Sequence, residues 1–472
     1  MTTDKYWVLR HPEFRRRVKR EFKEYDRTDY EDVIAVTPYK NPEYPQERSY
    51  NTRKPADADE YNKYDDSVTQ NAFENDVPDI VLDIIEIAVA TFAADKAVDR
   101  ENKIRENIDE SQLQTRNIKL QIPVLSSQIA TEEMEELYSE MVSHMTHDIV
   151  EYDFHQVESE ITVEETPSDS GPEAVSLLSD GLDSAAGVYH NKSQGTSSTY
   201  ATVTYGHGAK SKAEAIAERA GVDHETYRVQ YDGTGESTQF SRGLLHLSFG
   251  AAVASAKGVN DVRCFENGIM ARFLILSQGW LTTRTVSPLF VAYLNEILDQ
   301  TLEQTVEVRN PFEDLTKTEI LNKVPDTETI QMTVSCPHTA WFSSQNCGFC
   351  VPCLVRNVGI LASKHDVPLD ELSVYNALTA ADFETQTLDL NVNEINNPSA
   401  NSPEIFFKGI TEIAYFCRRV LQESPRELSD EYPNLLNEEI YDQHHRFASY
   451  FTTAMENVKS ENPTIETLLP EK

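Results

Sequence analysis

Between residues 173 and 310, short apolar runs alternate with longer segments in which apolar and small residues recur at helical spacing. The short runs are typical of strands buried on both faces. They lie at 174–178, 200–205, 225–231, 261–265 and 305–308. The longer segments predict helices that begin at 185 and that span 210–220, 241–257 and 286–302. Strands and helices in alternation predict an α/β fold with a doubly wound parallel sheet.

The regions on either side of this central domain (173–360) carry other patterns. An apolar stripe between Pro12 and Arg27 predicts an N-terminal helix within 1–36, and the aperiodic, polar stretch 37–76 predicts a linker. We expect a small α+β domain at 77–165 and a helical C-terminal extension at 361–472. Within the small domain, helices are expected at 79–98 and 132–145 and strands at 118–122 and 149–154.

The chain is strongly acidic. Its 42 Lys and Arg residues stand against 79 Asp and Glu residues, which gives a formal net charge of −37. Such an excess opposes binding to nucleic acid or to an anionic membrane. The charged first residues are unlike a signal peptide, and the most apolar stretch, 80–94, is too short to span a bilayer. We therefore expect a cytoplasmic protein, and a salt-rich cytoplasm would explain the acidity; an ordinary acidic surface is the alternative.

The stretch Ser179-Asp180-Gly181-Leu182-Asp183-Ser184 joins the first strand of the central domain to its first helix. In such a loop, backbone N–H groups and the positive end of the helix dipole converge and bind an anion. Gly181 permits a close approach of the backbone, and two serine hydroxyls can add donors. Asp183 can cap the helix or orient Mg²⁺. An ordinary turn between strand and helix is the alternative.

Other polar residues follow the later strands. Tyr205 and Gly206, Glu266 and Asn267, and Asn310 each come after an expected strand. Ligands of a doubly wound sheet bind beyond the carboxyl ends of its strands. We therefore expect these residues to surround one cleft together with the serine-flanked loop.

Four of the six cysteines cluster in the last third of the chain, at Cys336, Cys347, Cys350 and Cys353. Thiolates at this spacing can complete a tetrahedron around Zn²⁺, and four filled positions indicate a structural site. An iron–sulfur cluster would use the same ligands, and unligated buried thiols are a third reading. In a cytoplasmic protein the pattern favours a metal over disulfides.

Taken together, these motifs resemble the N-type ATP pyrophosphatase superfamily and, within it, the 7-cyano-7-deazaguanine synthase QueC. The loop at 179–184 is similar to the Ser-Gly-Gly-x-Asp-Ser pyrophosphate loop, with Asp180 in place of the first Gly. The resemblance to QueC covers roughly 173–360. It rests further on Tyr205-Gly206, on Arg242, on Asp314-Leu315-Thr316-Lys317-Thr318-Glu319-Ile320, on Val334-Ser335-Cys336 and on Cys347-Gly348-x-Cys350-x-x-Cys353-x-x-Arg356.

The resemblance implies an ATP-dependent carbon–nitrogen ligase. QueC activates a deazaguanine carboxylate as an acyl-adenylate, which ammonia converts to an amide, and a second activation yields the nitrile. By resemblance, ATP, Mg²⁺ and Zn²⁺ are the expected cofactors, and the four cysteines are the zinc ligands. The implied catalytic residues are Asp183, Lys317 and Arg242. The implied nucleotide-binding residues are Ser179, Gly181, Leu182, Asp183, Ser184, Tyr205, Gly206 and Asn267.

Two departures from QueC are visible. Residues 266–273 replace the QueC segment that helps to hold substrate, and about 170 residues precede the loop. In this plan the chain resembles QueC-like proteins of anti-phage defence operons, such as those of the Qat system, whose extension carries stretches similar to 87–95 and 116–124. We expect a small-molecule carboxylate as substrate and ammonia or a partner protein as the amine. A biosynthetic synthase for queuosine or archaeosine and a non-catalytic nucleotide-binding scaffold are the alternatives.

The charge balance generates a prediction about salt. If the acidic surface is an adaptation to a salt-rich cytoplasm, screening by salt will relieve the repulsion between carboxylates and stabilise the fold. The midpoint of thermal unfolding should therefore rise from dilute buffer to 2 M KCl, as measured by circular dichroism. A midpoint that is already maximal in dilute buffer would contradict the adaptation.

Overall fold

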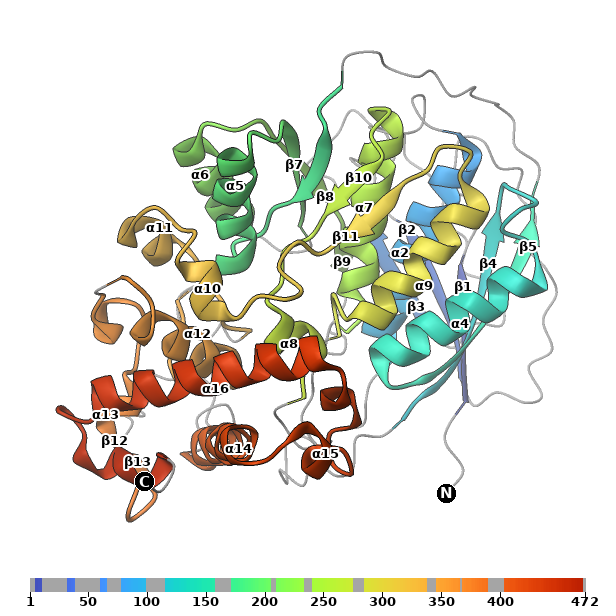
Figure 1. Cartoon of the computed structure of the whole chain (residues 1–472). Coiled ribbons are helices and arrows are strands. Elements are labelled where there is room, and N and C mark those ends of the chain that lie inside the picture. Colours follow the sequence, from blue (N-terminus) through green and yellow to red (C-terminus); the bar gives the residue numbers. More distant parts are fainter. Residues whose placement is uncertain are drawn as a thin grey trace.

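The main elements in the described part of the chain are a six-stranded β-sheet, a five-stranded β-sheet and a group of C-terminal helices (Figure 1). The computed structural model describes residues 5–10, 32–38, 60–65, 78–98, 115–157, 171–204, 209–232, 240–274, 284–337, 345–365, 367–388 and 403–469. Of the two sheets, the one nearer the middle of the sequence positions the candidate site.

This central sheet contains five parallel strands. In spatial order they are β11 (Glu307–Arg309), β10 (Asp261–Arg263), β6 (Ala174–Leu177), β7 (Ser198–Thr204) and β8 (His224–Arg228). The first strand in sequence, β6, lies in the middle, and later strands are added on both sides of it. The order therefore reverses beside β6, and the carboxyl end of β6 is the place where a ligand of such a sheet binds. The predicted α/β fold with a parallel sheet is confirmed.

Four helices flank this sheet, with α5 and α6 on one side and α7 and α9 on the other (Figure 1). Their bounds are α5 (Leu182–Gln194), α6 (Ala209–Ala220), α7 (Arg242–Ala256) and α9 (Pro288–Thr301). Small residues let two of them lie close to the sheet. A Cβ on Gly187 would come within 2.4 Å of the Phe265 ring, and one on Gly250 within 3.2 Å of Leu177.

The second sheet is mainly N-terminal. In spatial order it contains β5 (Ile149–Gln156), β4 (Asn117–Val124), β1 (Lys5–Arg10), β2 (Asp32–Pro38), β3 (Glu60–Asp65) and β9 (Gln230–Asp232). The first five run parallel, and β9 pairs antiparallel with β3. We call the described residues between 5 and 157 the N-terminal module. Through β9, the central domain contributes an edge strand to this module.

Part of this sheet lies where the sequence predicted no strand. The expected linker 37–76 contains β3, so that expectation is wrong for these six residues. Their sequence, Glu-Tyr-Asn-Lys-Tyr-Asp, is polar, and it is the ladders with β2 and β9 that make it a strand. The expected N-terminal unit 1–36 likewise contains β1 and the start of β2, whereas the predicted helix at 12–27 lies outside the described residues.

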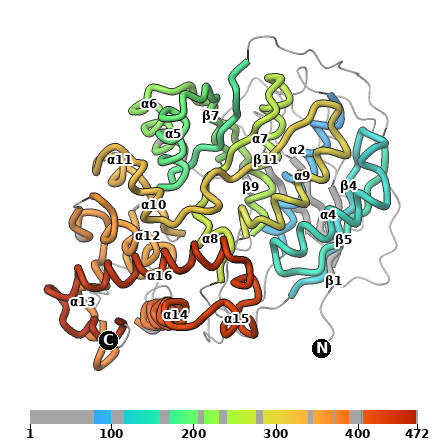
Figure 2. The backbone as a smooth tube through the Cα atoms, viewed as in Figure 1, coloured from blue at the N-terminus to red at the C-terminus, as the bar shows by residue number. Residues whose placement is uncertain are grey.

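The two sheets share one hydrophobic core. Helix α2 (Asp79–Ala97) is buried from Ile80 to Asp95. It packs against α7, while α4 (Glu132–Thr146) packs against α9 (Figure 2). A helix that is apolar on nearly every face needs cover on every side, and α2 finds it between the N-terminal sheet and the central domain. The N-terminal module and the central domain are therefore joined by a continuous core.

The C-terminal helices form a second core with the cysteine segment. Here α16 (Glu438–Val458) packs against both α12 (Val351–Leu361) and α14 (Pro403–Gln422). Gln443 of α16 donates Nε2–H bonds to the carbonyl oxygens of Glu313 and Leu315, at 2.8 and 3.2 Å. The C-terminal extension thereby braces the loop that leads to Lys317. None of the described helices is long and apolar enough to cross a bilayer.

The remaining elements are short. They are α8 (Gly268–Arg272), α10 (Lys317–Leu321), α11 (Thr327–Met332), α13 (Ala377–Ala380), α15 (Pro425–Leu428), the hairpin of β12 (Ala381–Asp382) and β13 (Thr387–Leu388), and 3₁₀ turns at 369–371, 433–436 and 463–468.

A buried ion-pair network closes the N-terminal module. The Arg116 guanidinium contacts Asp95 Oδ1 and Asp148 Oδ2, each at 2.6 Å, and all three side chains are almost fully buried. Arg116 Nη1 also donates to the carbonyl oxygens of Asp95 and Val98 at the end of α2. Burial alone would lower the pKa of Arg116, but the two carboxylates raise it above its ordinary value.

Removal of this arginine should destabilise the fold severely. In Arg116→Met the two carboxylates remain buried without their cation, and we expect a loss of about 3–5 kcal/mol in the free energy of unfolding, measured by urea denaturation. The control is Lys119→Met, which breaks a half-exposed pair with Asp153 at 3.8 Å and should cost no more than about 1 kcal/mol. Equal losses in the two variants would contradict a special role for the buried network.

Candidate functional site

The loop after β6 folds tightly around two serine hydroxyls. Ser179 Oγ lies 2.9 Å from Ser184 Oγ and accepts the Gly181 N–H bond at 3.1 Å. The Ser179 backbone N–H donates in turn to Ser184 Oγ at 3.1 Å. Gly181 is the N-cap of α5, so the first amides of a long helix face the space beyond the loop. The loop therefore lies beside β6, where the strand order reverses, and it is a candidate anion-binding loop.

Asp183 is the centre of the polar contacts behind this loop. Its Oδ1 accepts a bond from Lys317 Nζ at 2.7 Å, and its Oδ2 accepts bonds from the backbone N and from Nδ2 of Asn267, at 3.1 and 2.9 Å. Burial would raise the pKa of Asp183, but the Lys317 charge and the hydrogen bonds to the carboxylate together outweigh burial and lower that pKa. The structure thus brings together Asp183, Lys317 and Asn267, which are far apart in the sequence.

Glu266 is the neighbour that the sequence analysis placed at the cleft without giving it a role. Asn267 Nδ2 donates to Glu266 Oε1 at 2.8 Å. Burial and then the nearby Asp183 charge raise the pKa of Glu266 well above its ordinary value, against the opposing charges of Lys317 and Arg242. Two carboxyl groups so close together cannot both ionise easily, and we assign the charge to Asp183 and the proton to Glu266. A carboxylate shortly after the end of β10 is the signal that could have indicated it.

Asp180, which replaces a glycine of the resembled loop, is accommodated by cations. Burial raises the pKa of its carboxyl group, and the charges of Lys212 on α6 and of Arg242 on α7 oppose this rise. Its carbonyl oxygen accepts the Val334 N–H bond at 2.8 Å, which ties the loop to the segment that leads into the cysteines. Lys212 belongs to no recognised motif and was not among the predicted site residues.

The other candidates have different positions. Arg242 is the first residue of α7 and is half-buried. The Leu182 side chain belongs to an apolar cluster with Phe265 and Ile269, so only its main chain can face a ligand. Tyr205 and Gly206 lie outside the described residues.

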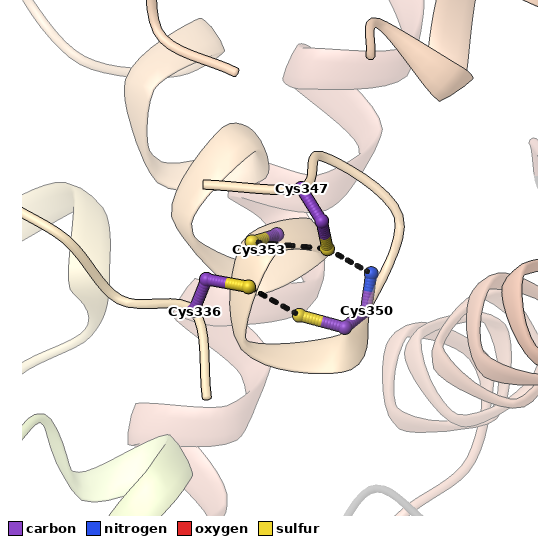
Figure 3. A group of neighbouring side chains, drawn as sticks. All are labelled: Cys336, Cys347, Cys350 and Cys353. Atoms are coloured by element: carbon purple, nitrogen blue, oxygen red, sulfur yellow. Dashed lines mark hydrogen bonds between the residues drawn. The ribbon is translucent and has the colours of Figure 1, made fainter. Parts of the chain in front are cut away.

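The four clustered cysteines converge on one point (Figure 3). The Sγ atoms of Cys336 and Cys350 lie 3.9 Å apart, those of Cys347 and Cys353 lie 3.7 Å apart, and all four are within 4.8 Å of one another. Sulfurs bound to one tetrahedral ion at about 2.3 Å are about 3.8 Å apart. The cysteine cage therefore has the dimensions of a single-ion zinc site.

Local structure explains the shape of the cage. Gly348 has a φ of +89°, a conformation that favours glycine, and a Cβ there would come within 1.8 Å of the Tyr375 carbonyl oxygen. This turn brings the Cys350 N–H to 3.3 Å from Cys347 Sγ, and α12 then begins at Val351. Hydrogen bonds from the neighbouring thiols lower the pKa of Cys336, and burial raises that of Cys353.

Helix α12 connects the cage to the polar site. The guanidinium of Arg356, fully buried, donates to Thr333 Oγ1 at 2.9 Å and to the Ile330 carbonyl at 2.7 Å, next to the strand-like segment that contacts Asp180. One turn later, a Cβ on Gly359 would come within 2.7 Å of Lys317 Cγ. Both Lys317 and the loop at 179–184 are therefore positioned against elements that the cage fixes.

Comparison with known families identifies part of this architecture. Residues 284–364 match the family model of the queuosine biosynthesis protein QueC. This segment is QueC-like. The match contains Lys317, all four cage cysteines and Arg356, whereas the loop at 179–184 lies before it. It covers well under half of the chain, and no curated protein matches the chain.

The cage predicts the metal content. We expect about one zinc ion per chain after purification, and we expect Cys353→Ser to lose it and to unfold at a lower temperature, because a structural site contributes directly to folding. Elemental analysis and thermal unfolding are the measurements. The control is Cys417→Ala, a buried cysteine outside the cage, which should keep the zinc. A wild-type protein that binds iron, or no metal, would contradict the assignment.

Proposed function

We propose that the chain is an ATP-dependent enzyme that adenylates a carboxylate and transfers the acyl group to an amine. The observation that carries this proposal is the contact of 2.7 Å between Asp183 and Lys317. This contact joins the loop at 179–184, a candidate anion-binding loop, to the segment that matches QueC. Neither part alone would support the proposal, since a loop of this shape is common and the family match is short.

The reaction proceeds in two steps that balance. A carboxylate oxygen attacks the α-phosphorus of ATP, forms an acyl phosphate bond and expels pyrophosphate. The amine nitrogen then attacks the acyl carbon, expels AMP and loses a proton, which leaves an amide. With 7-carboxy-7-deazaguanine and ammonia this is the first half of the QueC reaction, and that acid is the substrate we propose.

The loop residues have distinct parts in this scheme. The β- and γ-phosphates bind at the start of α5, to the Leu182 backbone amide and the Ser179 hydroxyl. The Gly181 amide and the Ser184 hydroxyl are bonded within the loop and hold its shape. Lys317 lies behind them and stabilises the negative charge that develops on the departing pyrophosphate, as a preorganised cation does. Arg242 approaches from α7 on the opposite side of the sheet.

Asp183 holds Lys317 in place before the nucleotide arrives. Burial of an ammonium group is costly without a counter-charge, and the contact of 2.7 Å with Asp183 supplies one. A Mg²⁺ ion accompanies the phosphates of ATP in the proposed reaction. Both oxygens of Asp183 already accept bonds from Lys317 and Asn267, so we assign no Mg²⁺ ligand to Asp183. The cysteine cage fits Zn²⁺ and holds the surrounding elements without taking part in the chemistry.

The acceptor amine is the finer part of the proposal. Residues 266–273 follow β10 and contain the short helix α8, whose first residue, Gly268, lies against Glu313 and Gln443. This segment differs from the substrate segment of QueC, so we propose two cases for the acceptor: ammonia, or an amine of a partner protein encoded in a defence operon. Free ammonium should be sufficient for amide formation in the first case alone.

The proposal predicts pyrophosphate release that depends on Lys317. With ATP, Mg²⁺ and 7-carboxy-7-deazaguanine, the wild type should release pyrophosphate, and Lys317→Met should lower kcat about 100-fold or more because it removes the cation from the leaving group. The matched control is Lys323→Met. Lys323 is exposed just beyond α10, and its substitution should leave the rate unchanged.

Folding and metal content must be compared in the same preparations, because Lys317→Met leaves Asp183 buried without its cation. Retained zinc together with a lost rate would support the catalytic role. No release by the wild type, or an undiminished rate in Lys317→Met, would overturn the proposal. ATP binding without turnover in the wild type would instead favour a nucleotide-binding scaffold.

A further inference from the structure

The start of α7 is held by the N-terminal module rather than by the central domain alone. Ser241, the N-cap residue of α7, donates both its backbone N–H and its hydroxyl to Asp95 Oδ2, at 3.0 and 2.8 Å. Asp95 lies in the last turns of α2, in the N-terminal module, and both residues are buried. One carboxylate oxygen from a distant part of the sequence therefore fixes the residue next to Arg242.

The other oxygen of Asp95 is itself fixed. Arg116 Nη2 donates to Asp95 Oδ1 at 2.6 Å, and the same nitrogen donates to Asp148 Oδ2 at 2.6 Å. Because Arg116 also bonds the last carbonyl oxygens of α2, Asp95 cannot turn away from Ser241 without breaking the end of that helix.

Two packing contacts restrict the position of the start of α7. The ring of Phe240 lies edge-on to the ring of His147, with centroids 5.9 Å apart, and His147 belongs to the N-terminal module. On the other side, a Cβ on Gly243 would come within 2.5 Å of the Thr285 carbonyl oxygen. Thr285 is at the beginning of the QueC-like segment, so Arg242 lies between that segment and the N-terminal module.

The geometry of α7 directs Arg242 toward the candidate site. Gly250 of α7 packs against Leu177, the last residue of β6. Arg242 precedes Gly250 by about two helical turns, or about 12 Å along the axis. Helix α7 begins at the carboxyl edge of the sheet and runs back toward the amino edge. Its first residue, Arg242, therefore lies at the same edge of the sheet as the loop at 179–184.

The surroundings of Arg242 agree with this placement. Its charge opposes the rise in the pKa of both Asp180 and Glu266, so it lies near both carboxyl groups. Among the described residues, no side chain forms an ion pair or a hydrogen bond with Arg242.

We propose that Asp95 is a positioning residue, which acts through Ser241 to fix Arg242 at the nucleotide site. The N-terminal module is then a part of the active centre and not an appended domain. This inference rests on the proposed function, because it assigns Asp95 a role in the same reaction.

The matched pair Asp95→Asn and Asp148→Asn tests the inference. Each substitution removes one of the two negative charges that contact Arg116, so each should lower the temperature of unfolding. Only Asp95 also accepts bonds from Ser241. We therefore expect Asp95→Asn alone to lower kcat for pyrophosphate release, by about tenfold or more, with the KM for ATP little changed. Hydrogen exchange of the peptide that contains Ser241 should be faster in that variant alone.

A double-mutant cycle measures the coupling between Ser241 and Arg242 in kcat, which a purely structural role of Ser241 would not produce. Ser241→Ala removes one bond to Asp95 and should lower kcat in the wild-type background, but it should have no further effect in Arg242→Ala. The inference alone is overturned if the wild type is active and Asp148→Asn slows the reaction as much as Asp95→Asn. It is also overturned if Ser241→Ala remains harmful in Arg242→Ala. A wild type that releases no pyrophosphate overturns the proposed function and this inference with it.

Discussion

The buried pair of Asp183 and Lys317 is the interaction on which the rest of the structure depends. It spans the distance between the loop after β6 and helix α10, and both side chains are nearly excluded from solvent. Burial of two charges is costly unless each is fully bonded, and here Asn267 supplies the remaining bonds to the carboxylate. Burial and the Asp183 charge raise the pKa of the third ionisable group, Glu266, and so oppose a second negative charge beside Asp183. A site arranged in this way holds a cation ready for an anionic ligand.

Several parts of the structure hold the elements that carry this pair in place. The cysteine cage fixes the start of α12, and α12 lies against Lys317 through Gly359. The C-terminal helix α16 braces the loop before α10 through Gln443. From the other side, the N-terminal module shares its core with α7 and bonds Ser241 through Asp95. The regions outside the central domain thus act on the site by holding its parts, although their own sequences carry no catalytic motif.

The sequence predicted those parts of the molecule in which local pattern and chemistry coincide. The parallel strands, the loop at 179–184 and the cysteine spacing each combine a strong local pattern with a known physical use, and the structure brings the corresponding residues together. Strand β3 was missed because its residues are polar and its pairing is decided by β2 and β9. The position of His444 was not predicted either: it is buried against Phe416, with its Nδ1 at 2.7 Å from the Ile440 carbonyl oxygen. Lys212 and Asp95 were missed because they act on residues far away in the sequence, and no spacing rule connects them.

The central claim is that the triphosphate of ATP binds at the start of α5 in contact with Lys317. A crystal structure with an ATP analogue that has a methylene bridge between the α- and β-phosphates tests it most directly, because that bond cannot be cleaved. We predict that the β- and γ-phosphates accept hydrogen bonds from the Leu182 backbone amide and the Ser179 hydroxyl, with Lys317 Nζ within hydrogen-bond distance of a phosphate oxygen. A nucleotide bound elsewhere on the molecule, with this loop empty, would contradict the account.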